Sequence, residues 1–205
     1  MTAIVDYGMG NLRSVQKGLE RAGVAAVITD DPDQIATAEA IVLPGQGSFG
    51  AAMERLNQLG LAEAIRDAVS REVPYLGICL GLQLLFDSSA EAPGVPGLGL
   101  LRGTCRRFND ARVKVPHMGW NQLSIRRRAP HLRDVQEGDF VYFVHSYYGV
   151  PEDPAVVATV TEYDVEFASS IWCGPLFATQ FHPEKSQQVG LSILRAFGEW
   201  LRERR

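Results

Sequence analysis

Short apolar runs alternate with helical patterns along the first half of the chain. Strands buried on both faces are predicted at residues 3–5, 24–28, 40–43 and 73–78. Between and after them, apolar residues at helical spacing predict helices through residues 12–19, 53–59, 61–69 and 80–86. Asn11 is a suitable N-cap for the first helix and Gly23 a suitable stop. Strands that alternate with helices predict βαβ units and a parallel sheet covered by helices on both faces.

The pattern changes after residue 90. Gly and Pro are frequent from 91 to 103, which predicts a surface loop. Short strands are predicted at 105–108, 122–125, 141–144, 156–161 and 167–171, followed by a strand at 176–181 and a closing amphipathic helix through residues 193–201. The predicted fold class is α/β, with a central, mostly parallel sheet flanked by helices and an antiparallel β elaboration in the second half. One domain over residues 1–205 is expected.

Composition and charge narrow the function classes. The 205 residues are 46% hydrophobic and 21% charged, which excludes a largely disordered chain. A net charge of −4 argues against a general nucleic-acid binder. No targeting segment is visible and no run reaches about 18 apolar residues, so no association with a membrane is expected and the cytoplasm is the predicted compartment.

Charge is unevenly distributed. Residues 91–135 carry 9 basic and 3 acidic side chains, including the run Arg126, Arg127 and Arg128. This run is interpreted as a solvated turn or as a docking surface for an acidic partner. RNA binding is least favoured, because no aromatic platform accompanies the charge.

Cysteine usage points to chemistry at one position. The three cysteines, Cys79, Cys105 and Cys173, contain no CxxC pair, so neither a disulfide framework nor a Cys-rich zinc site is expected. Cys79 lies between Gly77 and Gly81 at a predicted strand-to-helix junction, which is the cysteine version of a nucleophile elbow. A helix N-terminus favours the thiolate, and the N–H of Leu80 is an expected oxyanion donor. The alternative for Cys79 is a buried cysteine in a tight turn. Cys105 and Cys173 lie in strand-like runs without His or Glu companions and are interpreted as structural, packed residues.

A thiol nucleophile needs a base and a group that orients the base. His182 follows the last predicted strand, and Glu184 stands two residues later, on the same side if the chain is extended. The glycine-rich loop Gly45-Gln46-Gly47 follows another strand and is suited to complete an oxyanion hole. It lacks the Lys-Ser/Thr pair of a phosphate-binding P-loop, so a nucleotide is not expected.

These residues resemble the class I, triad-type glutamine amidotransferases. The resemblance rests on Cys79 within GxCxGxQ and on His182-Pro-Glu184. Asp6-Tyr-Gly-Met-Gly-Asn-Leu12, Pro44-Gly-Gln-Gly47, Pro116-His-Met-Gly-Trp-Asn121 and Phe143-Val-His-Ser-Tyr-Tyr148 further resemble the glutaminase subunits of imidazole glycerol phosphate synthases. Glutaminase subunits for anthranilate, aminodeoxychorismate or pyridoxal phosphate synthesis remain an alternative, as does a non-catalytic binding module of the same fold.

The resemblance implies a role for each motif. Cys79 is the nucleophile, His182 the base and then acid, and Glu184 its orienting carboxylate; Leu80 and Gly45–Gly47 form the oxyanion hole. Gly47, Gln83, His145, Ser146 and Tyr147 bind the substrate glutamine, and Asn11, Trp120, Asn121 and Lys185 face the partner. That partner is a separate (β/α)₈ synthase subunit, which receives ammonia, and no metal or organic cofactor is implied. The family loop usually carries a small branched residue where Gln46 stands, so the resting conformation of this loop is left open.

Overall fold

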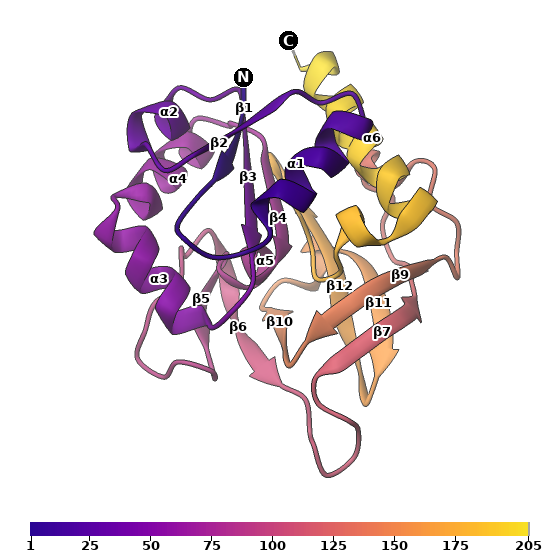
Figure 1. The fold of residues 1–205 in the computed structure, drawn as a ribbon. Coiled ribbons are helices and arrows are strands. Elements are labelled where there is room, and N and C mark those ends of the chain that lie inside the picture. The colour runs from indigo at the N-terminus through magenta and orange to yellow at the C-terminus, as the bar shows by residue number, and fades with distance from the viewer. Residues whose placement is uncertain (205) are drawn as a thin grey trace.

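An eight-stranded sheet runs through the centre of the molecule in the computed structural model, which describes residues 1–204 (Figure 1). Its strand order is β2-β1-β3-β4-β13-β12-β11-β8. The first five strands are parallel: β2 (Ala26–Thr29), β1 (Thr2–Val5), β3 (Ala40–Gly45), β4 (Tyr75–Cys79) and β13 (Leu176–Thr179). The last three run antiparallel: β12 (Val165–Cys173), β11 (Val157–Tyr163) and β8 (Ser124–Ile125). The predicted fold class is therefore confirmed.

Helices cover both faces of the parallel half. One face carries α1 (Leu12–Arg21) and α6 (Gln187–Glu203), and the other carries α2 (Pro32–Ala36), α3 (Phe49–Gln58) and α4 (Leu61–Ser70) (Figure 1). The side chains of β3 alternate between the two cores: Ile41 and Leu43 pack on the side of α3 and α4, and Ala40 and Val42 on the side of α1 and α6. Both faces of β3 are buried, which explains its uninterrupted apolar sequence.

Two small sheets extend the second half. One contains β5 (Phe86–Ser89), β6 (Leu101–Arg107) and β10 (Tyr147–Pro151); the other pairs β7 (His117–Gln122) with β9 (Phe140–His145). Pairing is antiparallel except between β5 and β6. Single helical turns lie at α5 (Leu80–Gln83) and at the 3₁₀ segments η1 (Pro130–Leu132), η2 (Pro154–Val156) and η3 (Pro183–Lys185).

The first helix begins and ends as its sequence predicts. The Asn11 side chain accepts a hydrogen bond from Ser14 N, and Gly23 follows the helix with a φ of 79°. The helix predicted over 80–86 is wrong in length, because α5 ends at Gln83 and Phe86 pairs with Leu101 as a strand. The apolar run 84–86 has neither helical nor strand periodicity, so packing decides its structure.

Further differences concern short elements. Helix α2 and strands β7 and β10 were not predicted, and the loop predicted over 91–103 ends earlier because β6 begins at Leu101. None of the helices within residues 1–204 combines the length and apolar character that crossing a bilayer requires.

Candidate active site

Three of the predicted site segments meet at one edge of the central sheet. Strands β3, β4 and β13 are neighbours, and their carboxyl ends coincide: Gly45 pairs with Cys79, and Ile78 pairs with Thr179. The oxyanion loop, the elbow and the segment that contains His182 therefore leave the sheet side by side. Ligand sites of parallel α/β sheets lie at this carboxyl edge.

Cys79 occupies a strained turn. Its φ of 54° and ψ of −105° are rare for a residue with a side chain, and such strain persists only where the surrounding structure holds it. A Cβ on Gly77 would lie 2.7 Å from Gly81 O, and one on Gly81 would lie 1.8 Å from Leu43 O on the neighbouring strand. Both glycines are required, as predicted. Helix α5 has only four residues, however, so the expected support from a helix dipole is smaller than a longer helix would give.

The sulfur has two polar neighbours besides the histidine. Cys79 is 6% exposed, its Sγ lies 3.8 Å from Val144 O, and Gln180 Nε2 donates to Sγ over 3.6 Å. A carbonyl oxygen accepts and an amide nitrogen donates, so the site offers one partner for a thiol and one for a thiolate.

His182 and Glu184 form a buried pair. Their Nδ1 and Oε1 atoms are 2.8 Å apart, and both side chains are almost completely buried. The expected extended chain is wrong here, because Glu184 lies in the 3₁₀ turn η3, which brings it back toward the ring of His182. Nδ1 thus carries the hydrogen that faces the carboxylate. Nε2 has no conventional hydrogen-bond partner within residues 1–204, and it is the nitrogen left to take the thiol proton.

The charge state of His182 follows from its neighbours. Burial disfavours the imidazolium, but the Cys79 thiolate and the Glu184 carboxylate overcome it and raise the pKa of His182 to about 9. The raised pKa favours the imidazolium form of His182, which is the form that a thiolate nucleophile needs beside it.

The oxyanion loop packs against the N-terminal motif. Tyr7, fully buried, donates its hydroxyl hydrogen to Pro44 O over 3.0 Å, and burial with the nearby Cys79 raises the pKa of Tyr7. A Cβ on Gly45 would lie 2.6 Å from Leu80 Cβ. Gly47 has a φ of 102°, and Gln46 is exposed. The Tyr7 contact was not predicted, although Asp6–Leu12 was singled out as a motif.

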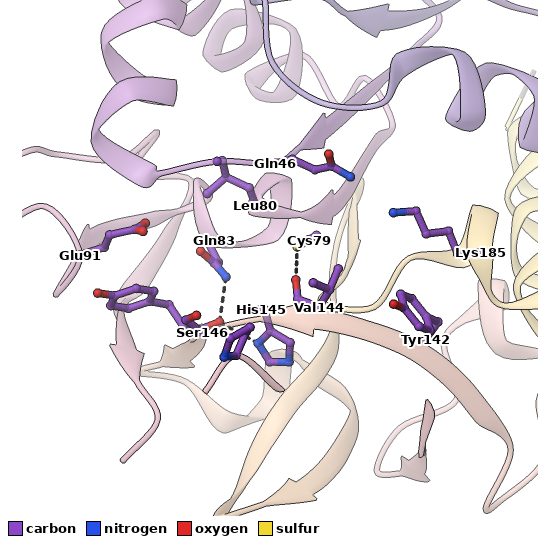
Figure 2. A pocket seen from close by; sticks show the side chains of 13 residues that line it. Gln46, Cys79, Leu80, Gln83, Glu91, Tyr142, Val144, His145, Ser146 and Lys185 are labelled. Carbon is purple, nitrogen blue, oxygen red and sulfur yellow. Dashed lines mark hydrogen bonds between the residues drawn. The ribbon is translucent and has the colours of Figure 1, made fainter. Parts of the chain in front are cut away.

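A cavity of about 440 Å³ opens above Cys79 (Figure 2). Nine predicted residues line it: Gln46, Gly47, Cys79, Leu80, Gln83, His145, Ser146, Tyr147 and Lys185. Four others were not predicted: Glu91, Pro116, Tyr142 and Val144. In Figure 2, Gln46 lies above Cys79 and Lys185 to its right, and Glu91 lies at the far left, beyond Gln83. The Glu91 carboxylate also accepts a hydrogen bond from Phe49 N over 2.8 Å.

His145 has no free ring nitrogen. Nδ1 lies 2.9 Å from Tyr147 O, which only accepts, so Nδ1 carries the hydrogen and Nε2 must accept. The donor is His117 Nδ1 at 3.0 Å, and His117 Nε2 in turn accepts from Asn121 Nδ2 at 3.3 Å. Burial lowers the pKa of His145 to about 3 and that of His117 to about 4, so both rings are neutral. His117 was not predicted.

The four residues expected at a partner interface differ in setting. Trp120 is 45% exposed on the outer face of β7, whereas the amide of the next residue, Asn121, donates to Glu162 O and contacts His117. Asn11 caps α1, and Lys185 lies at the cavity mouth. Asn11 and Trp120 are thus exposed, whereas Lys185 is half-buried at the cavity.

The arginine run is held within the molecule. Arg126 pairs with Glu166 at 2.6 Å, Arg127 stacks on the Trp172 ring and donates to Trp172 O, and Arg128 donates to Val135 O. These contacts favour the turn interpretation over a docking surface.

The two remaining cysteines differ in burial. Cys105 is buried, and burial raises its pKa well above the usual range. Cys173 is exposed, so the expectation that it packs in the core is wrong. No group of three or more metal-ligating side chains lies within residues 1–204.

The comparisons with known proteins agree with this geometry. Residues 3–199 match the family model described as glutamine amidotransferase class-I. The chain is 53% identical over 203 residues to the imidazole glycerol phosphate synthase subunit HisH of Geobacter sulfurreducens, covering 96% of this chain and 97% of that one. It is 50% identical to HisH of Aquifex aeolicus, covering 96% and 95%.

Solved structures share the fold at lower identity. Thermotoga maritima PurLQS superposes with a TM-score of 0.75 at 22% identity, covering 98% of each chain. A structure titled as a glutamine amidotransferase superposes with a TM-score of 0.74 at 19% identity, covering 98% of this chain and 97% of that one.

Proposed function

The chain belongs to the class I glutamine amidotransferases, and on that premise we propose that it is the glutaminase subunit of an imidazole glycerol phosphate synthase. It hydrolyses L-glutamine to glutamate and ammonia and delivers the ammonia to a (β/α)₈ synthase subunit in histidine biosynthesis. The observation that carries this is the buried Cys79–His182–Glu184 constellation beside a cavity of about 440 Å³.

The geometry supports a thioester mechanism. The Cys79 thiolate attacks the side-chain amide carbon of glutamine, and the carbonyl oxygen becomes an oxyanion. The backbone N–H groups of Leu80 and of the Gly45–Gly47 loop stabilise that oxyanion, and each such donor contributes about 100- to 1000-fold in rate. His182 gives its proton from Nε2 to the departing ammonia. It then takes a proton from the water that cleaves the thioester, while Glu184 holds Nδ1.

The cavity suits an α-amino acid. The side-chain nitrogen of Gln83 donates one hydrogen to Tyr147 O at 2.8 Å and the other to Gln180 Oε1 at 3.2 Å. Only the side-chain oxygen of Gln83 is therefore left to contact a ligand. That oxygen and the Glu91 carboxylate are acceptors for the glutamine ammonium group. The peptide groups of Ser146 and Tyr147 are the proposed site of its carboxylate.

The outer face of the β7–β9 ribbon is the proposed docking surface for the synthase subunit. Met118, Trp120 and Phe140 are 60%, 45% and 52% exposed, which is unusual for large apolar side chains on one ribbon. Tyr142 and Val144 of the same ribbon line the cavity, so a partner seated here covers its mouth together with Lys185. Ammonia then passes between subunits without meeting bulk water, where it would be protonated. The cytoplasm, where amino-acid biosynthesis takes place, is the proposed compartment.

Replacement of the nucleophile tests the proposal. In the complex with the synthase subunit, Cys79→Ala is expected to abolish glutamine-dependent synthesis and to leave synthesis from added ammonium salts unchanged. Cys173→Ser, at an exposed cysteine, is the matched control and retains both activities. Glutamine-dependent synthesis by Cys79→Ala, or loss of both activities in an intact complex, would contradict the assigned role.

A further inference from the structure

The buried side chain of Gln180 contacts both Cys79 and Gln83, a residue that lines the cavity. Gln180 lies between β13 and His182, is 0% exposed, and has no role in the mechanism described above. Its Nε2 donates to Cys79 Sγ over 3.6 Å, and its Oε1 accepts from Gln83 Nε2 over 3.2 Å. One side chain therefore contacts both the reacting atom and a residue that lines the cavity.

The orientation of the Gln180 amide follows from Tyr147 O, the acceptor at the other end of the series of hydrogen bonds that runs through Gln83 and Gln180. Tyr147 O can only accept, so the Gln83 atom 2.8 Å away must be nitrogen. The second hydrogen of that nitrogen points to Gln180, whose facing atom must be oxygen. Gln180 consequently turns its nitrogen, a donor without acceptor capacity, toward the sulfur.

A donor fixed in this direction distinguishes the two states of the sulfur. A thiolate accepts hydrogen bonds far better than a thiol, and hydrogen bonds to a charged group are about twice as strong as neutral ones. The other contact, the backbone carbonyl oxygen of Val144 at 3.8 Å, accepts a hydrogen bond and so suits the thiol. Of these two contacts, the amide of Gln180 is therefore the one that favours the ionised sulfur, in addition to the His182 imidazolium.

We propose that Gln180 is a further catalytic residue, whose side-chain N–H donates to Cys79 Sγ, keeps the sulfur ionised and aims it at the substrate, while Gln83 fixes the direction of the amide. This role rests on the proposed function, in which Cys79 is the nucleophile. It also assigns Gln83 a second task, because its amide nitrogen serves the nucleophile from within while its oxygen faces the ligand.

The test removes the hydrogen-bond donor at residue 180. Gln180→Met removes the amide, and Gln180→Leu is a second variant at the same position. Thr179→Val is the matched control, because Thr179 is equally buried but gives its hydroxyl hydrogen to Phe181 O at 2.9 Å. Alkylation of Cys79 by iodoacetamide is followed by mass spectrometry from pH 5 to 9.5 in a Cys173→Ser background, which removes the exposed competing thiol.

The pH of half-maximal alkylation is expected to rise by about one unit in both Gln180 variants, equivalent to about a tenfold smaller thiolate fraction below that pH. In the complex, kcat with glutamine falls about 10- to 100-fold, KM changes less than about threefold, and ammonia-dependent synthesis is unchanged. An alkylation profile like that of the parent, or an equal shift in Thr179→Val, overturns the proposal.

A measurement on the unsubstituted chain keeps the proposal testable if the variants do not fold. The side-chain amide proton of Gln180 is expected to move downfield in NMR spectra as Cys79 ionises, and a proton insensitive to that ionisation also overturns it. Either failure leaves the Cys79→Ala result standing, so it is distinguishable from failure of the proposed function.

Discussion

Glu184→Gln tests the electrostatic design of the triad with the smallest change of shape. The carboxylate lies 2.8 Å from His182 Nδ1, and both side chains are nearly inaccessible. In the parent protein the pKa of His182 is about 9 instead of 6.5, because Cys79 and Glu184 outweigh the cost of burial. A rise of this size corresponds to roughly 3 kcal/mol of net stabilisation of the imidazolium.

Two effects follow from the substitution. The neutral amide no longer stabilises the imidazolium, so the pKa of His182 falls and the cation is lost at a lower pH. In addition, the new NH₂ group donates to Nδ1 when it faces the ring, which places the ring hydrogen on Nε2 and removes the base. We expect kcat with glutamine to fall at least about 100-fold, toward the roughly 10,000-fold that the analogous change causes in Ser-His-Asp triads.

The assay is glutamine-dependent synthesis by the complex from pH 6 to 10, with ammonium-dependent synthesis as the measure of an intact complex. The alkaline limb of the glutamine profile should move toward neutral pH in Glu184→Gln. Glu166→Gln, which removes an exposed carboxylate from its pair with Arg126, is the control and should match the parent. A kcat within threefold of the parent, with an unshifted alkaline limb, would refute the reasoning.

Three other changes should have distinct outcomes. Gly81→Ala should prevent correct folding of the elbow, because its Cβ would lie 1.8 Å from Leu43 O. In Gly50→Ala the new Cβ would lie 3.1 Å from the Ala92 Cβ, and the free energy of unfolding in urea titrations should change by less than about 1 kcal/mol. Burial, aided by Arg133, lowers the pKa of His131 to about 3 in the folded protein. As the pH falls below 6.5, the unfolded chain binds a proton at His131 that the folded protein does not, so the free energy of unfolding decreases. His131→Leu should reduce this decrease between pH 7 and 5 by about 2 kcal/mol. Trp120→Ala should weaken binding of the synthase subunit about 30-fold in calorimetry without lowering the melting temperature.

The parallel half of the fold was predictable because its sequence is locally consistent. Its buried strands are mostly apolar runs, and α1 carries its Asn11 cap and Gly23 stop at the expected places. Strand β7 was missed because its pattern is inverted: Met118 and Trp120 point outward while His117 is buried. A half-buried strand is normally predicted from apolar residues on the inner face and polar residues on the outer face, and β7 has the opposite arrangement. This arrangement is consistent with a face that a partner covers.

The site was predictable as separate motifs but not as a network. Glycines around a cysteine and a His-x-Glu pair carry local signals, and the sheet brings them together because β3, β4 and β13 are neighbours. The supporting contacts have no local signal, because Tyr7 and Pro44 are 37 residues apart and Gln180 and Cys79 are 101 apart. Such contacts depend on the tertiary fold alone.

The structure also gives a reason to propose His182, and not His145, as the base. Both are buried and both belong to motifs at the cavity, yet the pKa of His182 is raised to about 9 and that of His145 is lowered to about 3. His182 faces two anionic groups, and Nε2 is left for the thiol proton. Both ring nitrogens of His145 are already hydrogen-bonded: Nδ1 donates to Tyr147 O, and Nε2 accepts from His117 Nδ1. A proton added at Nε2 would therefore face the N–H of His117. Environments that separate two pKa values this far support the proposal that His182 carries the proton and that His145 has a structural role. His145→Gln should consequently raise the KM for glutamine, through loss of the Tyr147 contact, and leave the alkaline limb of the pH profile where it is; a shift of that limb would show that His145 exchanges protons with the site.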